Sequence, residues 1–240
     1  MKIELCSAHL DSLILAQEFN FDTIELCQNL EIGGITPSLA FQEYALSFKT
    51  FKTHVLIRNR AGGFVYSDLE KKIMLKDMEN SVKLGVYGLV VGAINENKEL
   101  DLAFLKEIKT QFPDIDLTFH RAFDDIQNQE LALESLVDLG FKRILTSGGK
   151  QNALEGKTQL QKTITQANNR IEILVGGGIT KENVSEIIKF TKTDSIHFSG
   201  TIPTQIDSDS LFSEKISLPN REKIEEILKK INSFNSFKIK

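Results

Sequence analysis

The tetrapeptide IELC occurs at residues 3–6 and again at residues 24–27, and these two copies contain both cysteines of the chain. Each copy lies in a short β-rich run, KIELC and DTIEL, that predicts a strand. Successive side chains of a strand point to opposite faces, so each copy puts its isoleucine and leucine on one face and its glutamate and cysteine on the other. The repeat therefore predicts two similar strands near the start of the fold.

Six more strand-like runs follow along the chain, at residues 50–57, 86–92, 115–121, 142–147, 171–178 and 195–200. Segments with apolar residues at helical spacing alternate with the runs, at residues 10–19, 39–48, 67–85, 101–112, 128–140, 160–169 and 181–191. Eight strands alternating with helices in a chain of 240 residues match the count and size of a (β/α)8 TIM barrel. A doubly wound open sheet is the alternative within the α/β class, but no GxGxxG follows the first strand.

We expect a single domain over residues 1–240, because the chain has no low-complexity tract and no obvious linker. The barrel core takes residues 1–202. Residues 203–240 make a C-terminal polar stretch and a last helix, for which Pro219 and Asn220 supply start signals.

Composition and charge exclude several classes of partner. The formal net charge is -4 with a pI near 5.7, so the chain has no basic excess for nucleic acid. No apolar run is long enough to span a membrane. The N-terminus has no cationic stretch followed by a hydrophobic signal region, so we expect a cytoplasmic protein with reduced thiols.

The polar face of the IELC repeat predicts a site inside the barrel. If isoleucine and leucine face the helices, Glu4 and Glu25 point inward. Cys6 and Cys27 then lie at the C-terminal ends of neighbouring strands, about 4.8 Å apart, where TIM barrels build their active sites. Two thiols at that separation could hold Cu(I). The alternative is that both cysteines pack as small buried hydrophobes.

An inward carboxylate must be paired or hydrogen-bonded, because a lone buried charge is too costly. The third strand supplies candidate bases in VLIRNRAGG, where Arg58 and Arg60 follow the apolar run. The glycine pair after them would let the loop approach a ligand. We therefore expect the two arginines to face the glutamates and to bind an anionic ligand.

The fifth strand ends in TFHRAFD, which brings His120, Arg121 and Asp124 into one short turn. His120 is a candidate general acid or base near neutral pH, together with Glu4 and Glu25. The alternative for His120 is a structural histidine that is hydrogen-bonded at the rim.

The ends of the sixth, seventh and eighth strands are rich in glycine and hydroxyl residues. The candidates for ligand binding there are Ser147, Gly176, Gly177, Gly178, His197 and Ser199. Loops after strands seven and eight of TIM barrels often bind phosphate with backbone N–H groups, so we expect a small anionic, possibly phosphorylated ligand at this rim. The alternative is that the glycines only permit tight turns.

Several of these motifs together resemble one family. ELC in the first two strands, GGITPS, VLIR with a following arginine, FVYSD, TFHRAFD, LALESLVDLGFKRILTSGG and VGGGIT are similar to the CutC family, over nearly the whole length to about residue 200. The resemblance implies a cytoplasmic TIM barrel, a homodimer or higher homo-oligomer, and a role in copper homeostasis. It also implies Cu(I) binding through Cys6 and Cys27.

The chain departs from the family pattern in one loop. Members typically have IRPRGGDF where this chain has IRNRAGGF, so Asn59, Ala61 and Gly63 replace a proline, a glycine and an aspartate. Any role that this aspartate has in the family is therefore in doubt for this chain. We therefore expect a copper homeostasis protein that binds Cu(I) through the rim cysteines, and the alternative is an enzyme of unknown reaction on a small anionic substrate.

Overall fold

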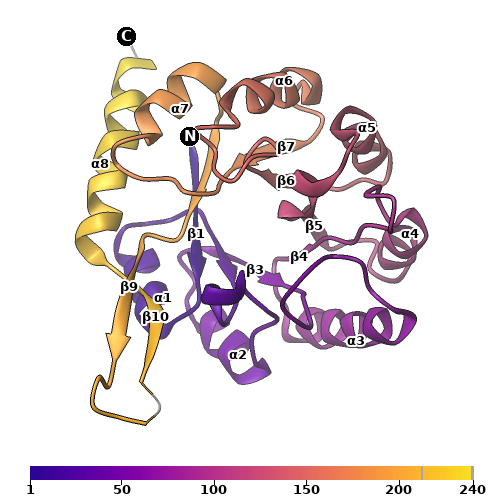
Figure 1. The fold of residues 1–240 in the computed structure, drawn as a ribbon, viewed down its shortest axis with the longest axis horizontal. Helices are drawn as coiled ribbons and strands as arrows, with labels where there is room; N and C mark the ends of the chain where they lie inside the picture. The colour runs from indigo at the N-terminus through magenta and orange to yellow at the C-terminus, as the bar shows by residue number, and fades with distance from the viewer. Residues whose placement is uncertain (212, 239–240) are drawn as a thin grey trace.

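Eight parallel strands close into a barrel in chain order, with β1 paired to both β2 and β8 (Figure 1). The computed structural model describes residues 1–211 and 213–238. The strands are β1 (Lys2–Ser7), β2 (Thr23–Leu26), β3 (Lys52–Leu56), β4 (Gly88–Val91), β5 (Asp116–Phe119), β6 (Arg143–Thr146), β7 (Glu172–Val175) and β8 (Ser195–Phe198). This closed sheet confirms the predicted (β/α)8 barrel.

Helices surround the barrel and connect successive strands (Figure 1). They are α1 (Leu10–Glu18), α2 (Leu39–Ser47), α3 (Asp68–Leu84), α4 (Leu102–Gln111), α5 (Gln129–Asp138), α6 (Lys157–Ala167), α7 (Val184–Thr191) and α8 (Arg221–Lys238), with 3₁₀ turns η1 (Leu30–Ile32) and η2 (Arg121–Asp125). The longest connecting helix, α3, begins at a capping box of Ser67 and Glu70 and ends at Gly85 with φ +85°. Among the helices of the described residues, none is both long and apolar enough to cross a membrane.

Buried apolar side chains form two clusters, one on each face of the barrel. Leu5, Ile24 and Leu26 belong to the large cluster between strands and helices. Cys6 and Cys27 belong to a small cluster inside the barrel, where they pack with Leu56 and Val90. The predicted alternation of the IELC repeat is therefore confirmed, with the thiols inside and the aliphatic pair outside.

The segment after the barrel contains more structure than the predicted polar stretch. Strands β9 (Thr201–Ile206) and β10 (Glu214–Pro219) form an antiparallel hairpin beside the barrel, and α8 follows directly (Figure 1). The backbone N–H of Ser217 donates to the Glu31 carboxylate, which attaches the hairpin to the loop after β2. Ile224 of α8 is fully buried next to Gly200, so the last helix packs on the end of β8.

Candidate metal and ligand site

The two thiols lie side by side inside the C-terminal end of the barrel. The Sγ atoms of Cys6 and Cys27 are 3.7 Å apart. Cys6 is 5% exposed and Cys27 is fully buried. The hydrogen bond with Cys27, together with burial, raises the pKa of the Cys6 thiol well above its ordinary value. Cys6 is therefore a neutral thiol until a cation displaces its proton.

Glu25 lies next to Cys6 and is only partly satisfied. The Cys6 Sγ atom contacts Oε1 of Glu25 at 4.0 Å. Within the described residues, Oε2 of Glu25 is buried and has no hydrogen-bond partner. Burial raises the pKa of Glu25, and the nearby Glu4 carboxylate adds to the rise, although His197 and Arg143 oppose it. A buried carboxylate with an unused oxygen is a feature of a ligand site.

Glu4 lies two residues before Cys6 on β1, deeper in the barrel, and its carboxylate is fully hydrogen-bonded. Its carboxylate accepts hydrogen bonds from Nη1 of Arg143 at 2.5 Å, Oγ1 of Thr23 at 2.9 Å and Nδ1 of His197 at 2.9 Å. Burial alone would raise the pKa of Glu4, but Arg143 and His197 outweigh it and hold that pKa far below its ordinary value. Glu4 is therefore an ionised, positioned carboxylate.

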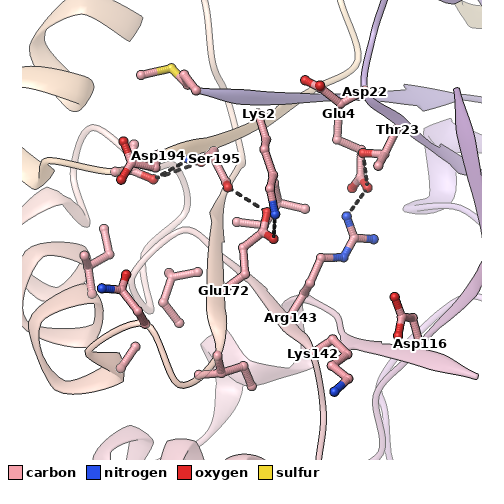
Figure 2. Close-up of a pocket in the computed structure, with 18 of the residues that line it drawn as sticks. Lys2, Glu4, Asp22, Thr23, Asp116, Lys142, Arg143, Glu172, Asp194 and Ser195 are labelled. Carbon is pink, nitrogen blue, oxygen red and sulfur yellow. Dashed lines mark hydrogen bonds and ion pairs between the residues drawn. The ribbon is translucent and has the colours of Figure 1, made fainter. Parts of the chain in front are cut away.

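Arg143 reaches Glu4 from the opposite, N-terminal mouth of the barrel, which opens as a depression of about 850 Å³ (Figure 2). Its Nε donates to Thr118 at 2.8 Å. At the rim of the depression, Glu172 pairs with Lys2 and accepts from Ser195. At this mouth, Lys2 and Glu172 are thus paired with each other, and Arg143 is paired with Glu4 at the base of the barrel.

His197 lies between Glu4 and Cys6 and joins the deep carboxylate to the thiols. Burial by itself would lower the pKa of His197, but hydrogen bonds with Cys6 and Glu4 raise it well above its ordinary value. Donor atoms of Cys6, Glu25 and His197 all lie within 4.8 Å of one another, and all three residues are buried. These three side chains can hold a metal ion.

The expected pairing of Arg58 and Arg60 with the inward glutamates is wrong, because Arg143 and His197 take that role. Arg58 donates to three backbone carbonyls in the loops after β2 and β3, at 2.6 to 3.0 Å. Arg60 pairs with Glu70 at the start of α3 and donates to the carbonyl of Val65 at 2.8 Å. Both arginines therefore hold loops in place. They follow the last residue of β3, and side chains beyond a strand end no longer alternate between the inside and the outside of the barrel.

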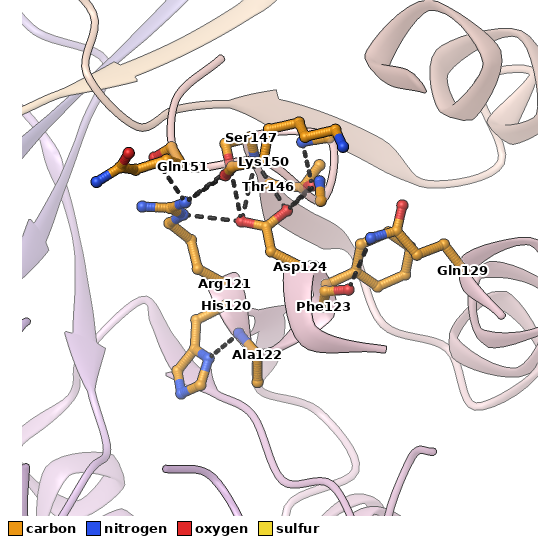
Figure 3. A network of polar contacts seen from close by, with 12 residues as sticks. His120, Arg121, Ala122, Phe123, Asp124, Gln129, Thr146, Ser147, Lys150 and Gln151 are labelled. Atoms are coloured by element: carbon orange, nitrogen blue, oxygen red, sulfur yellow. Dashed lines mark hydrogen bonds and ion pairs between the residues drawn. The ribbon is translucent and has the colours of Figure 1, made fainter. Parts of the chain in front are cut away.

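Asp124 organises the rim between β5 and β6 (Figure 3). It accepts from Nε of Arg121 at 2.8 Å, Oγ1 of Thr146 at 2.5 Å, and both the hydroxyl and the N–H of Ser147. A further N–H, that of Gly149, donates to it at 3.0 Å. Asp124 and Ser147 therefore fix the guanidinium of Arg121, which is 40% exposed at the cavity edge.

His120 lines the cavity and is buried. Its Nδ1 accepts from the N–H of Ala122 at 3.0 Å, which places the ring proton on Nε2. The ring lies 4.8 Å from the Phe64 ring, centroid to centroid. Burial and the nearby Arg58 charge lower the pKa of His120 to about 3, so the ring is neutral at pH 7. In this state the Nε2–H group, which has no partner among the described residues, can donate a hydrogen bond to a ligand, and the acid–base role of His120 stays a prediction.

A cavity of about 330 Å³ opens above the thiols at the C-terminal end of the barrel. The sequence-predicted residues that line it are Cys6, Glu25, Arg58, His120, Arg121, Gly177, Gly178, His197 and Ser199. Those that do not are Glu4, Cys27, Arg60, Asp124, Ser147 and Gly176. In the described part of the chain, Glu25 Oε2, Arg58 Nε and His120 Nε2 are buried without partners, and all three residues line this cavity.

Two residues that contribute to the candidate site were not predicted from the sequence. Arg143 carries a detectable signal, because it is a charged residue at the start of an otherwise apolar run, RILT, and shares a strand face with Leu145. Lys223 at the start of α8 lines the cavity and donates to the carbonyl of Thr201 at 2.8 Å. No pattern in the sequence relates α8 to the site, because the position of α8 depends on the path of the chain after β8.

Comparisons with known proteins show the family and the fold of the chain. The CutC family model matches residues 1–202. A CutC protein of Glaesserella parasuis serovar 5 (strain SH0165) is 40% identical over 227 residues, covering 95% of this chain and 93% of the relative. A crystal structure of CutC from Streptococcus agalactiae, whose name refers to copper homeostasis, is 35% identical with a TM-score of 0.78, covering 82% of this chain and 97% of its own.

A more distant structure, N-(5'-phosphoribosyl)anthranilate isomerase from Pyrococcus furiosus, is 15% identical with a TM-score of 0.59 and covers 97% of this chain and 99% of its own. At that identity the likeness extends to the barrel fold alone. The family match and the two close relatives together decide the identity. The chain belongs to the CutC family.

Proposed function

We propose that this protein binds Cu(I) between Cys6 and Cys27 and acts in copper homeostasis in the cytoplasm. The observation that carries the proposal is the 3.7 Å separation of the two Sγ atoms, where Cys6 lines the cavity and Cys27 is buried behind it. Thiolates are soft ligands that select Cu(I) over hard cations. Copper is the cargo here, held by the two thiols after both lose their protons.

The surroundings of the pair support a buried cuprous thiolate. The barrel interior around Cys6 and Cys27 is apolar on one side, with Leu56 and Val90 in contact. On the other side, the imidazole of His197 provides a charged hydrogen-bond donor beside Cys6, which offsets the charge of a thiolate. The name of the Streptococcus agalactiae structure also points to copper homeostasis.

A competition titration tests the proposal. Reduced protein is titrated with Cu(I) against a cuprous chelator, alongside Cys6→Ser, Cys27→Ser and the double variant. We expect one ion per chain for the parent protein and none that competes with the chelator for the double variant. His120→Gln is the matched control, because it changes a cavity residue outside the thiol pair. Equal Cu(I) binding by the double variant would eliminate the dithiolate site.

A second candidate function is an enzyme that acts on a small anionic molecule. The observation that favours it is the convergence of three unpartnered buried polar atoms, on Glu25, Arg58 and His120, within the described cavity wall. A copper carrier has no need for them. In this function Arg121 and Lys223 attract the anion, Glu25 moves a proton, and His120 donates a hydrogen bond.

Soaking with phosphate or sulfate tests this second function. We expect the anion to lie near Gly177 and Ser199 or at Arg58 in a crystal grown with either salt. Arg121→Met should weaken phosphate binding measured by NMR titration, whereas Arg60→Met should not, because Arg60 lies outside the cavity. An empty rim at high anion concentration would argue strongly against a phosphorylated substrate.

A further inference from the structure

We infer that Cys6, Glu25 and His197 form a second metal site, which takes a divalent ion of the zinc class and shares only Cys6 with the copper pair. The inference goes beyond the proposed copper function, because it involves another ion, another donor set and another chemistry. It rests on the geometry of the three donors, on the way His197 is oriented, and on the local charge balance.

The three donors form a compact, buried set. Their ligand atoms all lie within 4.8 Å of one another. Sulfur, imidazole nitrogen and carboxylate oxygen are the three ligand types that zinc takes in proteins, whereas a hard carboxylate is a poor ligand for Cu(I). The unused Oε2 of Glu25, which has no hydrogen-bond partner in the described part of the chain, is a second and independent indication of a missing ligand.

Glu4 orients His197 in the manner of metal-binding histidines. Nδ1 of His197 donates to the Glu4 carboxylate at 2.9 Å, and Glu4 is itself held by Arg143 and Thr23. A carboxylate that accepts from one ring nitrogen fixes the tautomer and leaves the other nitrogen for a metal. Because Glu4 takes Nδ1, Nε2 is the ring nitrogen that we assign to the metal, together with Cys6 and Glu25.

Charge balance favours a divalent ion over a monovalent one. The ionised forms of Glu4, Glu25 and Cys6 carry three negative charges, and Arg143 carries one positive charge. A divalent cation beside a neutral His197 brings the buried group to neutrality, which a buried site requires. Binding releases the thiol proton of Cys6 and the Nε2 proton of His197 to solvent.

The site leaves a coordination position open to the cavity. All three donor residues line the 330 Å³ cavity, so a bound ion has three protein ligands and faces the space next to His120 and Arg121. Three protein ligands and one open position are the arrangement of catalytic zinc sites, whereas structural sites are closed by four. The ion would serve as a Lewis acid for an anionic molecule held in this cavity.

The test uses Zn²⁺ alone, titrated into reduced, metal-free, full-length protein against a zinc chelator. We expect one ion per chain. His197→Gln and Glu25→Gln should each weaken Zn²⁺ binding at least about tenfold, since even indirect partners of a metal ligand contribute that much. Cys27→Ser should leave Zn²⁺ affinity essentially unchanged while it abolishes tight Cu(I) binding. Glu25→Gln is isosteric, so it keeps the test valid if His197→Gln fails to fold.

X-ray absorption at the zinc edge of the parent protein provides a readout without any variant. We expect one sulfur at about 2.3 Å and nitrogen or oxygen ligands at about 2.0–2.1 Å. A shell with two sulfurs, or equal loss of Zn²⁺ in Cys27→Ser and His197→Gln, would overturn the inference. Cu(I) binding without Zn²⁺ binding would overturn it and leave the copper proposal intact, and Zn²⁺ binding without Cu(I) binding would do the reverse.

Discussion

Nδ1 of His197 lies 2.9 Å from Oε1 of Glu4, a residue 193 positions earlier in the chain. The contact joins the last barrel strand to the first, where the two residues are register partners. It occupies Nδ1 of His197, so Nε2 is the ring nitrogen that is left for another group. The chemistry of the cavity floor therefore depends on closure of the barrel.

Arg143→Met should destabilise the protein by about 3–5 kcal/mol, because it leaves the buried Glu4 carboxylate without its main countercharge. Both side chains are more than nine-tenths buried. Urea unfolding at pH 7 measures the change. Adding Glu4→Gln to Arg143→Met should recover part of the loss, since a neutral amide needs no countercharge.

Arg170→Met is the control for that prediction. It breaks an ion pair with Glu134 in which both side chains are about 40% exposed, so the unfolding free energy should hardly change. If Arg143→Met proved as mild as Arg170→Met, the buried pair would not hold the barrel interior together as described.

Unfolding free energy should fall as the pH drops from about 6.5 toward 3, partly because of His54. Burial lowers the pKa of His54 to about 3 in the folded protein. An unfolded histidine has a pKa of about 6.5, so within that window the unfolded state binds more protons and acid favours it. The stabilisation is fully present above pH 6.5.

His54→Phe isolates this contribution. The variant keeps a ring against Tyr87, whose centroid lies 5.3 Å away, but cannot be protonated. Between pH 7 and pH 5 the parent protein should lose about 2 kcal/mol more unfolding free energy than the variant. Urea unfolding at the two pH values measures the difference. Parallel losses in the two proteins would mean that His54 titrates normally in the folded state.

Gly34→Ala should both destabilise the fold and weaken Cu(I) binding. Gly34 has φ +81°, and an added Cβ would lie 2.9 Å from a methyl of Leu56 and 3.3 Å from Cβ of Cys27. Overpacking and the left-handed backbone together should cost about 1–3 kcal/mol. Thermal unfolding and the cuprous competition titration measure the two effects.

Gly63→Ala is the matched control in a neighbouring loop, where an added Cβ meets no described heavy atom within 4 Å. It should leave stability and Cu(I) affinity unchanged. Unaltered copper binding in Gly34→Ala would show that displacement of Cys27 is tolerated, and would count against the thiol pair as a preorganised site.

Asp124→Ala should loosen the loop after β6, because this carboxylate accepts from two backbone N–H groups, two hydroxyls and Arg121. We expect a loss of at least about 2 kcal/mol of stability. Amide hydrogen exchange should accelerate at Ser147 and Gly149. The neighbouring exposed Asp125→Ala should show neither change.

Much of the barrel and the inward direction of its thiols could be predicted from the sequence. The alternation of strand-like and helical runs is local information, and so is the two-residue period that separates Cys6 from Leu5. The hairpin of β9 and β10 was missed, because half of its strand residues are polar and none of them is fully buried. Such strands lack the apolar alternation by which a strand is recognised.

Partners across the barrel could not be predicted. The buried Glu4 carboxylate requires a basic partner. The strand that supplies this partner depends on how the barrel closes and on the stagger of its strands, and no local sequence pattern encodes either of them. Arg58 and Arg60 were nearer in sequence than Arg143, and the structure uses them to bind loop carbonyls and Glu70 instead. The roles of Glu25, His120 and the glycine-rich loops stay predictions until ligands are measured.

The contact between Glu4 and His197 has a consequence for biosynthesis. Both cysteines leave the ribosome early, while the imidazole that completes their surroundings arrives only with the final barrel strand. A nascent or truncated chain that ends before residue 197 thus contains both thiols but lacks the last strand and its imidazole. In the metal functions proposed above, any selection among ions that depends on His197 therefore belongs to the finished polypeptide.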